Sequence, residues 1–127
     1  MEHRQHRTDD YPTDEWLYDG LSLEHWFDPC PLYGEEWFGD GLAMDWPDRT
    51  YVNPPYSKPA PWIEKAIETA KQGKRVIMLV KHDTSTKWWA RLQEAGARFL
   101  PIMGRLKYGT GKAAAFPSVI VVLRRDE

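Results

Sequence analysis

The sequence predicts one α/β domain, and three observations support this class. Apolar runs at 76–80 and 119–123 have the length of buried strands, and the segment 61–72 places its apolar residues on one helical face. Strand and helix signals alternate along the chain, as in folds built on a partly parallel sheet. The 127 residues, 42% of them hydrophobic, are enough for a single core. We expect a compact sandwich whose sheet is parallel at its centre and antiparallel at its C-terminal edge.

The first half of the chain carries few regular elements. Residues 1–12 are charged and end at Pro12, so we predict a flexible tail ahead of a single domain spanning 13–127. The capping pattern that starts at Thr13 predicts a short helix, and Pro29 stops a brief strand. These early elements are a helix over 13–19, a strand over 23–28, a loop over 32–48 and a strand over 51–52.

The second half of the chain is more regular. Pro61 suits the first position of a helix, and Gly73 and Gly96 suit the positions just after two helices. Thr84 or Ser85 is expected to cap the second helix, and a proline interrupts the strand after it. The expected elements are a helix over 61–72, a strand over 75–80, a helix over 87–94, and strands over 97–104, 105–108 and 118–123.

Composition excludes several classes of protein. The net charge of −2 gives no global basic field for tight non-specific DNA binding, although it is compatible with a local basic patch. The single cysteine cannot form an internal disulfide, and no Cys/His cluster has the spacing of a zinc site, so no metal is expected. No apolar run is long enough to span a bilayer, and residues 1–10 lack the apolar part of a signal peptide. We therefore expect a soluble intracellular protein.

The stretch Asn53-Pro54-Pro55-Tyr56 follows the expected strand at 51–52 and carries the clearest chemical signal. Open α/β sheets bind ligands at the carboxyl ends of their strands, where this stretch is expected to lie. The Asn53 carboxamide and a backbone carbonyl can accept the protons of an exocyclic amine, which exposes the nitrogen lone pair for in-line attack. Tyr56 offers a flat face to a planar base, and the prolines fix these groups in advance. The alternative is a rigid turn that Asn53 only caps.

Four pieces of the sequence, in this order, resemble the phage-type (Dam-like) DNA N6-adenine methyltransferases. They are "NPPYS" at 53–57, "DTSTKWW" at 83–89, "GRLKYG" at 104–109 and "FPS" at 116–118. The resemblance runs from about residue 28 to residue 123. It implies a reduced Rossmann-like methyltransferase sheet, S-adenosylmethionine as cofactor, DNA as partner, and methylation of the N6 amine of adenine. It also implies a phage or prophage gene and a cytoplasmic location in a prokaryotic host.

The resemblance assigns roles to the residues of the motif. Asn53 and the backbone of Pro54, held by Pro55, would bind the N6 amine, and Tyr56 would stack on the flipped adenine. No general base is required, because a neutral amine attacks a sulfonium and the resulting cation then loses its proton to water. The work of the residues is therefore alignment and dipolar stabilisation.

The cofactor residues that the resemblance implies lie in two pieces. Asp28-Pro29-Cys30 would bind at the end of the first strand, and Asp45-Trp46 would meet the adenosine part of the cofactor. Each assignment has a structural alternative. Asp28 is also suited to a plain turn before Pro29, Asp45 to a helix or turn cap, and Trp46 to the core.

The chain leading to the motif is short. No Gly-x-Gly loop follows Asp28, and 24 residues separate Asp28 from Asn53, fewer than the ~30 of a βαβ unit. The cofactor site is therefore expected to be reduced and more open. The chain also lacks an insertion long enough for a separate target-recognition domain. The missing βα unit leaves apolar sheet faces that a homodimer could cover.

Basic residues of the second half are candidate DNA contacts. The segment "KYGTGK" places two lysines in a loop between strands, where they can lie along phosphates. For any one lysine the alternative is a solvated surface charge. The candidates are Lys58, Lys81, His82, Lys87, Arg105, Lys107 and Lys112, with Phe116 at the border of the adenine pocket.

Two other functions stay open. The same four-residue motif also serves enzymes that methylate RNA bases or protein amides, so the acceptor is not fixed by the motif. A non-catalytic nucleic-acid-binding remnant with an eroded cofactor site is the third hypothesis. The missing glycine loop and the small size of the chain favour that remnant.

Overall fold

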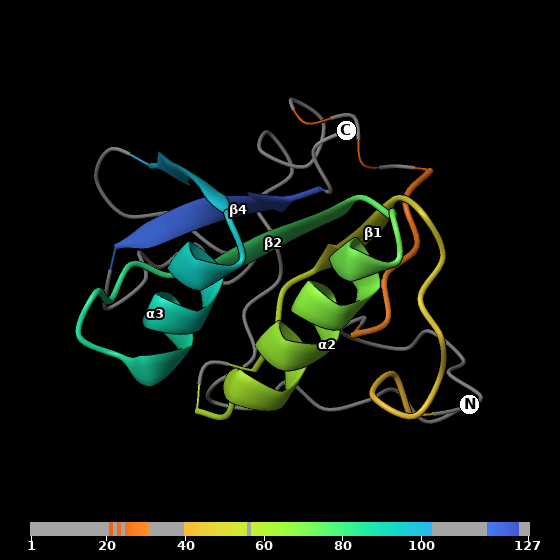
Figure 1. Ribbon diagram of the computed structural model, residues 1–127, viewed down its shortest axis with the longest axis horizontal. Coiled ribbons are helices and arrows are strands. Elements are labelled where there is room, and N and C mark those ends of the chain that lie inside the picture. Colours follow the sequence, from red (N-terminus) through yellow and green to blue (C-terminus); the bar gives the residue numbers. More distant parts are fainter. Residues whose placement is uncertain are drawn as a thin grey trace, which may run out of the picture.

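The computed structural model describes residues 21, 23, 25–30, 40–55, 57–102 and 117–124. These residues form a four-stranded mixed sheet with two helices on one face (Figure 1). The class predicted from the sequence, α/β, is confirmed. The elements are β1 (Thr50–Val52), α2 (Ala60–Lys71), β2 (Val76–Lys81), α3 (Lys87–Glu94), β3 (Arg98–Pro101) and β4 (Ser118–Leu123).

The strand order β1-β2-β4-β3 places the C-terminal strand inside the sheet. β1 pairs with β2 in parallel, while β4 runs antiparallel to both β2 and β3. A parallel bridge from Phe27 to Thr50 extends the parallel side beyond β1. The predicted parallel centre is thus seen only in part, because the parallel pairing lies toward one side of the sheet. The antiparallel pairing is also wider than the predicted C-terminal edge, because it includes β2, β4 and β3.

Both helices cover the same face of the sheet because both crossovers advance in the same direction. α2 connects β1 to β2, and α3 connects β2 to β3, which lies beyond β4. β3 has the same direction as β2, since each is antiparallel to β4. Right-handed crossovers between strands of the same direction then place α2 and α3 side by side, as Figure 1 shows.

The alternation of side chains along β2 divides the core between the two faces. Val76, Met78 and Val80 are buried against the helices, whereas Ile77 and Leu79 belong to a second cluster on the opposite face. The second cluster also contains other buried side chains. These are Leu23, Tyr51 and Ile120. A strand buried on both faces reads as a continuous apolar run, which is why the segment "VIMLV" predicted β2.

The helix ends agree with the sequence in two respects and differ in one. Gly73 and Gly96 follow α2 and α3 with φ of 88° and 78°, a backbone region that glycine adopts without steric cost. The cap of α3, however, is Thr86 and not Thr84 or Ser85: its hydroxyl accepts a hydrogen bond from Trp89 N at 3.2 Å. The Thr86 hydroxyl also donates to Asp83 O. The turn after β2 therefore places Thr86, and not Thr84 or Ser85, at the cap position of α3.

The strand expected at 23–28 is reduced to the single bridge at Phe27, so that assignment was too long. β3 ends at Pro101, which does not interrupt the pairing: Ile102 N still donates to Ser118 O at 3.2 Å, so the N–H that proline lacks is not needed for the ladder with β4. The predicted tail at 1–12, the helix at 13–19 and the strand at 105–108 lie outside the described residues.

Candidate functional site

Three sequence motifs meet at one edge of the sheet, at the carboxyl ends of its parallel segments. The bridge at Phe27 is followed by 28–30 and β1 by 53–55, while β2 ends at Lys81 and is followed by 82–83. Phe27 and Thr50 are partners in a parallel bridge. Cys30 lies three residues after Phe27, and Asn53 lies three residues after Thr50. The predicted cofactor piece and the predicted catalytic turn therefore leave the sheet next to each other. This edge is where open α/β sheets bind ligands.

The predicted catalytic turn, Asn53-Pro54-Pro55, is held by burial and by the start of α2. Pro54 and Pro55 are buried, and Asn53 is half-buried with its Oδ1 atom away from solvent. Lys58 N donates to Pro55 O at 3.3 Å, and the next hydrogen bond, Ile63 N to Pro59 O at 3.0 Å, begins the helix. The turn is thus short and fixed at both ends. Tyr56 lies outside the described residues.

Asp28 forms the turn that was the alternative to cofactor binding. Its Oδ1 accepts a hydrogen bond from Cys30 N at 2.9 Å, and Pro29 and Cys30 are buried. Gly41 packs directly on this turn, since a Cβ at that position would lie 2.1 Å from Pro29 O. The segments 28–30 and 40–46 therefore lie side by side. This contact brings the two predicted cofactor pieces together, although their binding of a cofactor stays a prediction.

Trp46 lies in the core. Its side chain is 1% exposed, and its indole Nε1 donates to Gly41 O at 2.8 Å. One ring face stacks on Trp62 with 6.2 Å between ring centroids, and Lys65 Nζ lies 6.0 Å from the ring. The indole is therefore committed to packing, which was the structural alternative for Trp46. Asp45, directly before it, is exposed.

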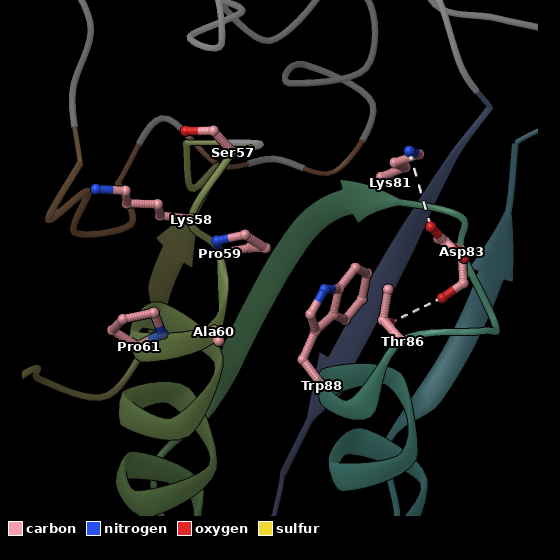
Figure 2. A pocket seen from close by; sticks show the side chains of 9 residues that line it. All are labelled: Ser57, Lys58, Pro59, Ala60, Pro61, Lys81, Asp83, Thr86 and Trp88. Carbon is pink, nitrogen blue, oxygen red and sulfur yellow. Dashed lines mark hydrogen bonds and ion pairs between the residues drawn. The ribbon is translucent and has the colours of Figure 1, made fainter.

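A cavity of about 460 Å³ opens at the same edge, on the other side of the predicted catalytic turn (Figure 2). It lies between the start of α2, the end of β2 and the start of α3. The lining residues are Ser57, Lys58, Pro59, Ala60, Pro61, Lys81, Asp83, Thr86 and Trp88. The volume is within the range of small-molecule sites. Two of the predicted DNA contacts, Lys58 and Lys81, are among these residues.

Asp83 is fixed as an anion at the rim of the cavity. Its Oδ1 accepts hydrogen bonds from Ser85 Oγ at 2.5 Å and Ser85 N at 3.1 Å, and its Oδ2 lies 3.7 Å from Lys81 Nζ. The Ser85 hydrogen bonds, followed by the charge of Lys81, lower the pKa of Asp83. A carboxylate held in this way is a poor proton acceptor and a good hydrogen-bond acceptor.

His82 does not pair with its neighbour Asp83. Its ring stacks on Trp89 with 5.2 Å between centroids, and its backbone N donates to Pro117 O. Trp89 in turn stacks on Phe99 at 4.3 Å. His82 thus packs in an aromatic stack, whereas the Asp83 carboxylate contacts Ser85 and Lys81.

Trp88 and Asp83 line the cavity, although neither was among the predicted site residues. Their signal was the motif "DTSTKWW", which the resemblance used without giving either residue a role. Of the other predicted DNA contacts, Lys87 is exposed on α3. Arg105, Lys107, Lys112 and Phe116 lie outside the described residues. Among the described residues there is no cluster of three or more His, Cys, Asp or Glu suited to a metal ion, and no helix suited to crossing a membrane.

The fold and the site define an α/β protein with an Asn-Pro-Pro turn and a ligand-sized cavity at the carboxyl ends of parallel strands. The family model described as "DNA N-6-adenine-methyltransferase (Dam)" matches residues 7–122. The chain therefore belongs to this family, which confirms the resemblance seen in the sequence.

Two phage proteins show the similarity over shorter stretches. A DNA N-6-adenine-methyltransferase of Haemophilus phage HP1 is 44% identical over 50 residues, which are 38% of this chain and 29% of that protein. A DNA N-6-adenine-methyltransferase of Escherichia phage T1 is 34% identical over 52 residues, which are 41% of this chain and 22% of that protein. The matched stretches thus span less than a third of either relative.

Proposed function

We propose that this chain is an S-adenosylmethionine-dependent methyltransferase that acts on the N6 amine of adenine in DNA. The observation that carries the proposal is the Asn53-Pro54-Pro55 turn at the carboxyl end of β1, in a chain that belongs to the Dam family. We also propose that β1, α2 and β2 form the βαβ unit of a reduced Rossmann-like methyltransferase sheet. Their parallel pairing and helical crossover support this interpretation.

In the proposed mechanism, the protein aligns the amine and supplies no base. The Asn53 carboxamide and the Pro54 carbonyl accept the two N6 protons, so that the nitrogen lone pair points away from the turn. Tyr56 stacks on the adenine and keeps its ring in one plane. Burial of Pro54 and Pro55 fixes the acceptors before substrate arrives, so little ordering is needed when the adenine enters.

The residues beside β1 fit S-adenosylmethionine in part. The carboxylates of Asp28 and Asp45 suit the hydroxyl and amino groups of the cofactor, and Asp45 is exposed. Trp46 does not fit an adenine-stacking role, because its indole is buried against Trp62. When bound, the cofactor supplies a methyl group on a sulfonium. We propose that Asp28 and Asp45 hold it from one side of Asn53.

Asn53→Ala tests the proposal. Loss of the amide acceptor should lower methyl transfer to DNA about 100-fold or more, with the folded state and the cofactor affinity retained. Transfer is measured from labelled S-adenosylmethionine to DNA, RNA and protein in separate reactions, followed by nucleoside analysis for N6-methyladenine. Gln72→Ala is the matched control, because it removes an exposed amide at the opposite end of α2. Full activity of Asn53→Ala, or label in RNA or protein only, would contradict the proposal.

One observation favours the non-catalytic remnant as a second candidate. Trp46 is buried, and Asp28 uses one carboxylate oxygen in its own turn, so the described cofactor side offers few groups to a ligand. Calorimetry separates the two functions. The methyltransferase binds S-adenosylmethionine in the presence or absence of DNA, and the remnant binds DNA alone.

Location and assembly are further parts of the proposal. We propose that the protein acts in the cytoplasm of a bacterial host, as its phage relatives suggest. We propose a homodimer that covers the apolar sheet faces, and gel filtration with light scattering tests it.

A further inference from the structure

The cavity between the first turns of α2 and α3 is a second site at the catalytic edge. We infer that it binds the base adjacent to the target adenine, so that the neighbouring nucleotide is stacked on Trp88 while the adenine lies at Asn53. This inference rests on the proposed function, because it presumes DNA as the substrate. The cavity would then read the base next to the target adenine, so this recognition would need no separate target-recognition domain.

The position of the cavity fits a neighbouring base and not the reacting one. None of Asn53, Pro54 and Pro55 lines it, so an amine inside the cavity would not be held by their acceptors. The lining nevertheless begins at Ser57, two residues after Pro55. The cavity is therefore adjacent to the amine site without being part of it, as consecutive bases of one strand require.

The walls of the cavity suit a flat ring. Figure 2 shows the Trp88 indole standing between the first turns of α2 and α3. Apolar side chains of the α2 start form another wall: Pro59, Ala60 and Pro61. An aromatic face stacks on any base, whereas a bare phosphate gains nothing from apolar walls. A nucleobase is thus favoured over a simple anion.

The division of labour between the two adjacent tryptophans supports this assignment. Trp89 is 5% exposed and stacks on Phe99 and His82, so it fills the core beneath α3. Trp88 is only half-buried and lines the cavity. Core packing accounts for Trp89 and accounts only in part for Trp88. The exposed part of the Trp88 indole is what a base would cover.

A donor and an acceptor stand together at the rim. Lys81 Nζ lies 3.7 Å from Asp83 Oδ2, while the other oxygen of Asp83 is occupied by Ser85. A base edge presents acceptors and donors next to one another, which a lysine and a carboxylate can meet as a pair. Thr86 takes no such role, because its hydroxyl donates to Asp83 O and accepts from Trp89 N. The pair Lys81–Asp83 therefore orients the base that Trp88 stacks.

A cycle that combines a protein variant with a DNA lesion tests the inference. Oligonucleotides carry one adenine with either a normal or an abasic neighbour, and binding is measured by fluorescence anisotropy with S-adenosylhomocysteine present. For the unchanged protein, the abasic neighbour should weaken binding about tenfold. For Trp88→Ala, normal and abasic oligonucleotides should bind equally weakly. Trp88→Phe, which keeps a ring, should restore most of the difference.

Further variants separate the inference from its alternatives. Lys81→Met should weaken binding of the normal oligonucleotide more than Lys71→Met, which removes an equal charge at the far end of α2. An equal abasic effect in the unchanged protein and in Trp88→Ala would overturn the inference. So would a loss of cofactor binding in Trp88→Ala with DNA binding intact, because the cavity would then hold the adenine of the cofactor. The binding results can support the base site even if the protein, unchanged or substituted, does not methylate DNA. In that case the base site stands and the proposed function fails.

Discussion

The two sides of the predicted catalytic turn are built in opposite ways, and α2 lies between them. On the side of the predicted cofactor residues, Gly41, Pro29 and Trp46 are in close contact and leave the indole 1% exposed. On the other side, Trp88 and the end of β2 border a cavity of about 460 Å³. Both sides carry tryptophan and carboxylate side chains. The comparison shows that residue type alone does not distinguish a closely packed side from a side that borders a cavity.

The two tryptophans give the largest expected contrast. Trp46→Ala should lower the free energy of unfolding by about 3–5 kcal/mol, because it empties a fully buried site. Trp88→Ala should cost about 1 kcal/mol, since the side chain is half-buried, and its main effect should be on DNA binding. Urea denaturation measures both changes. Equal losses of stability would show that the two sides of the turn are packed alike.

Gly41→Ala tests the closeness of the packed side. The added methyl would meet Pro29 O at 2.1 Å, a contact that only backbone movement can relieve, so we expect a loss of about 3 kcal/mol. Gly73→Ala is the control, because its Cβ meets nothing within 4 Å and its cost, about 1 kcal/mol, comes from φ alone. Gly41→Ala should also weaken cofactor binding, measured by calorimetry on the folded fraction. Unchanged affinity would argue against 28–30 as a cofactor segment.

The ion pair before β1 is expected to give the smallest effect and a dependence on pH. Asp48 accepts hydrogen bonds from Arg75 N at 2.7 Å and Nη2 at 2.6 Å, which lower the pKa of its carboxyl below the ordinary value. A lowered pKa in the folded state adds stability above the unfolded-state pKa and loses it as pH falls below about 4. Both side chains are nearly half exposed, so solvent screens the interaction.

Asp48→Asn should therefore flatten the decline of stability below about pH 4, with little change in DNA or cofactor binding. Thermal melts across the acidic range measure the effect, and high salt should reduce it. Asp40→Asn is a matched control, since that exposed carboxylate accepts only a local hydrogen bond from Leu42 N. A change in DNA binding for Asp48→Asn would indicate that this end of the sheet is coupled to the site.

The regular elements of the second half could be predicted from local sequence. The apolar face of 61–72 predicted α2, and Gly73 and Gly96 marked both helix ends because each takes a positive φ. The run "VIMLV" predicted a buried strand. The cap of α3 was misplaced because Thr84, Ser85 and Thr86 are all good capping residues. Only the turn that Asp83 makes with Ser85 fixes which of them meets Trp89 N.

What the sequence determined by itself was the chemistry of the motif and the class of the fold, because both depend on residue type and on neighbours along the chain. Asn53, Pro54 and Pro55 predict an amine site from residue type and from the strand that precedes them. The tertiary structure alone decided the strand order, with β4 inserted between β2 and β3. It also decided that Trp46 is buried while Trp88 lines a cavity. These features depend on contacts between residues far apart in the chain, which no local pattern encodes.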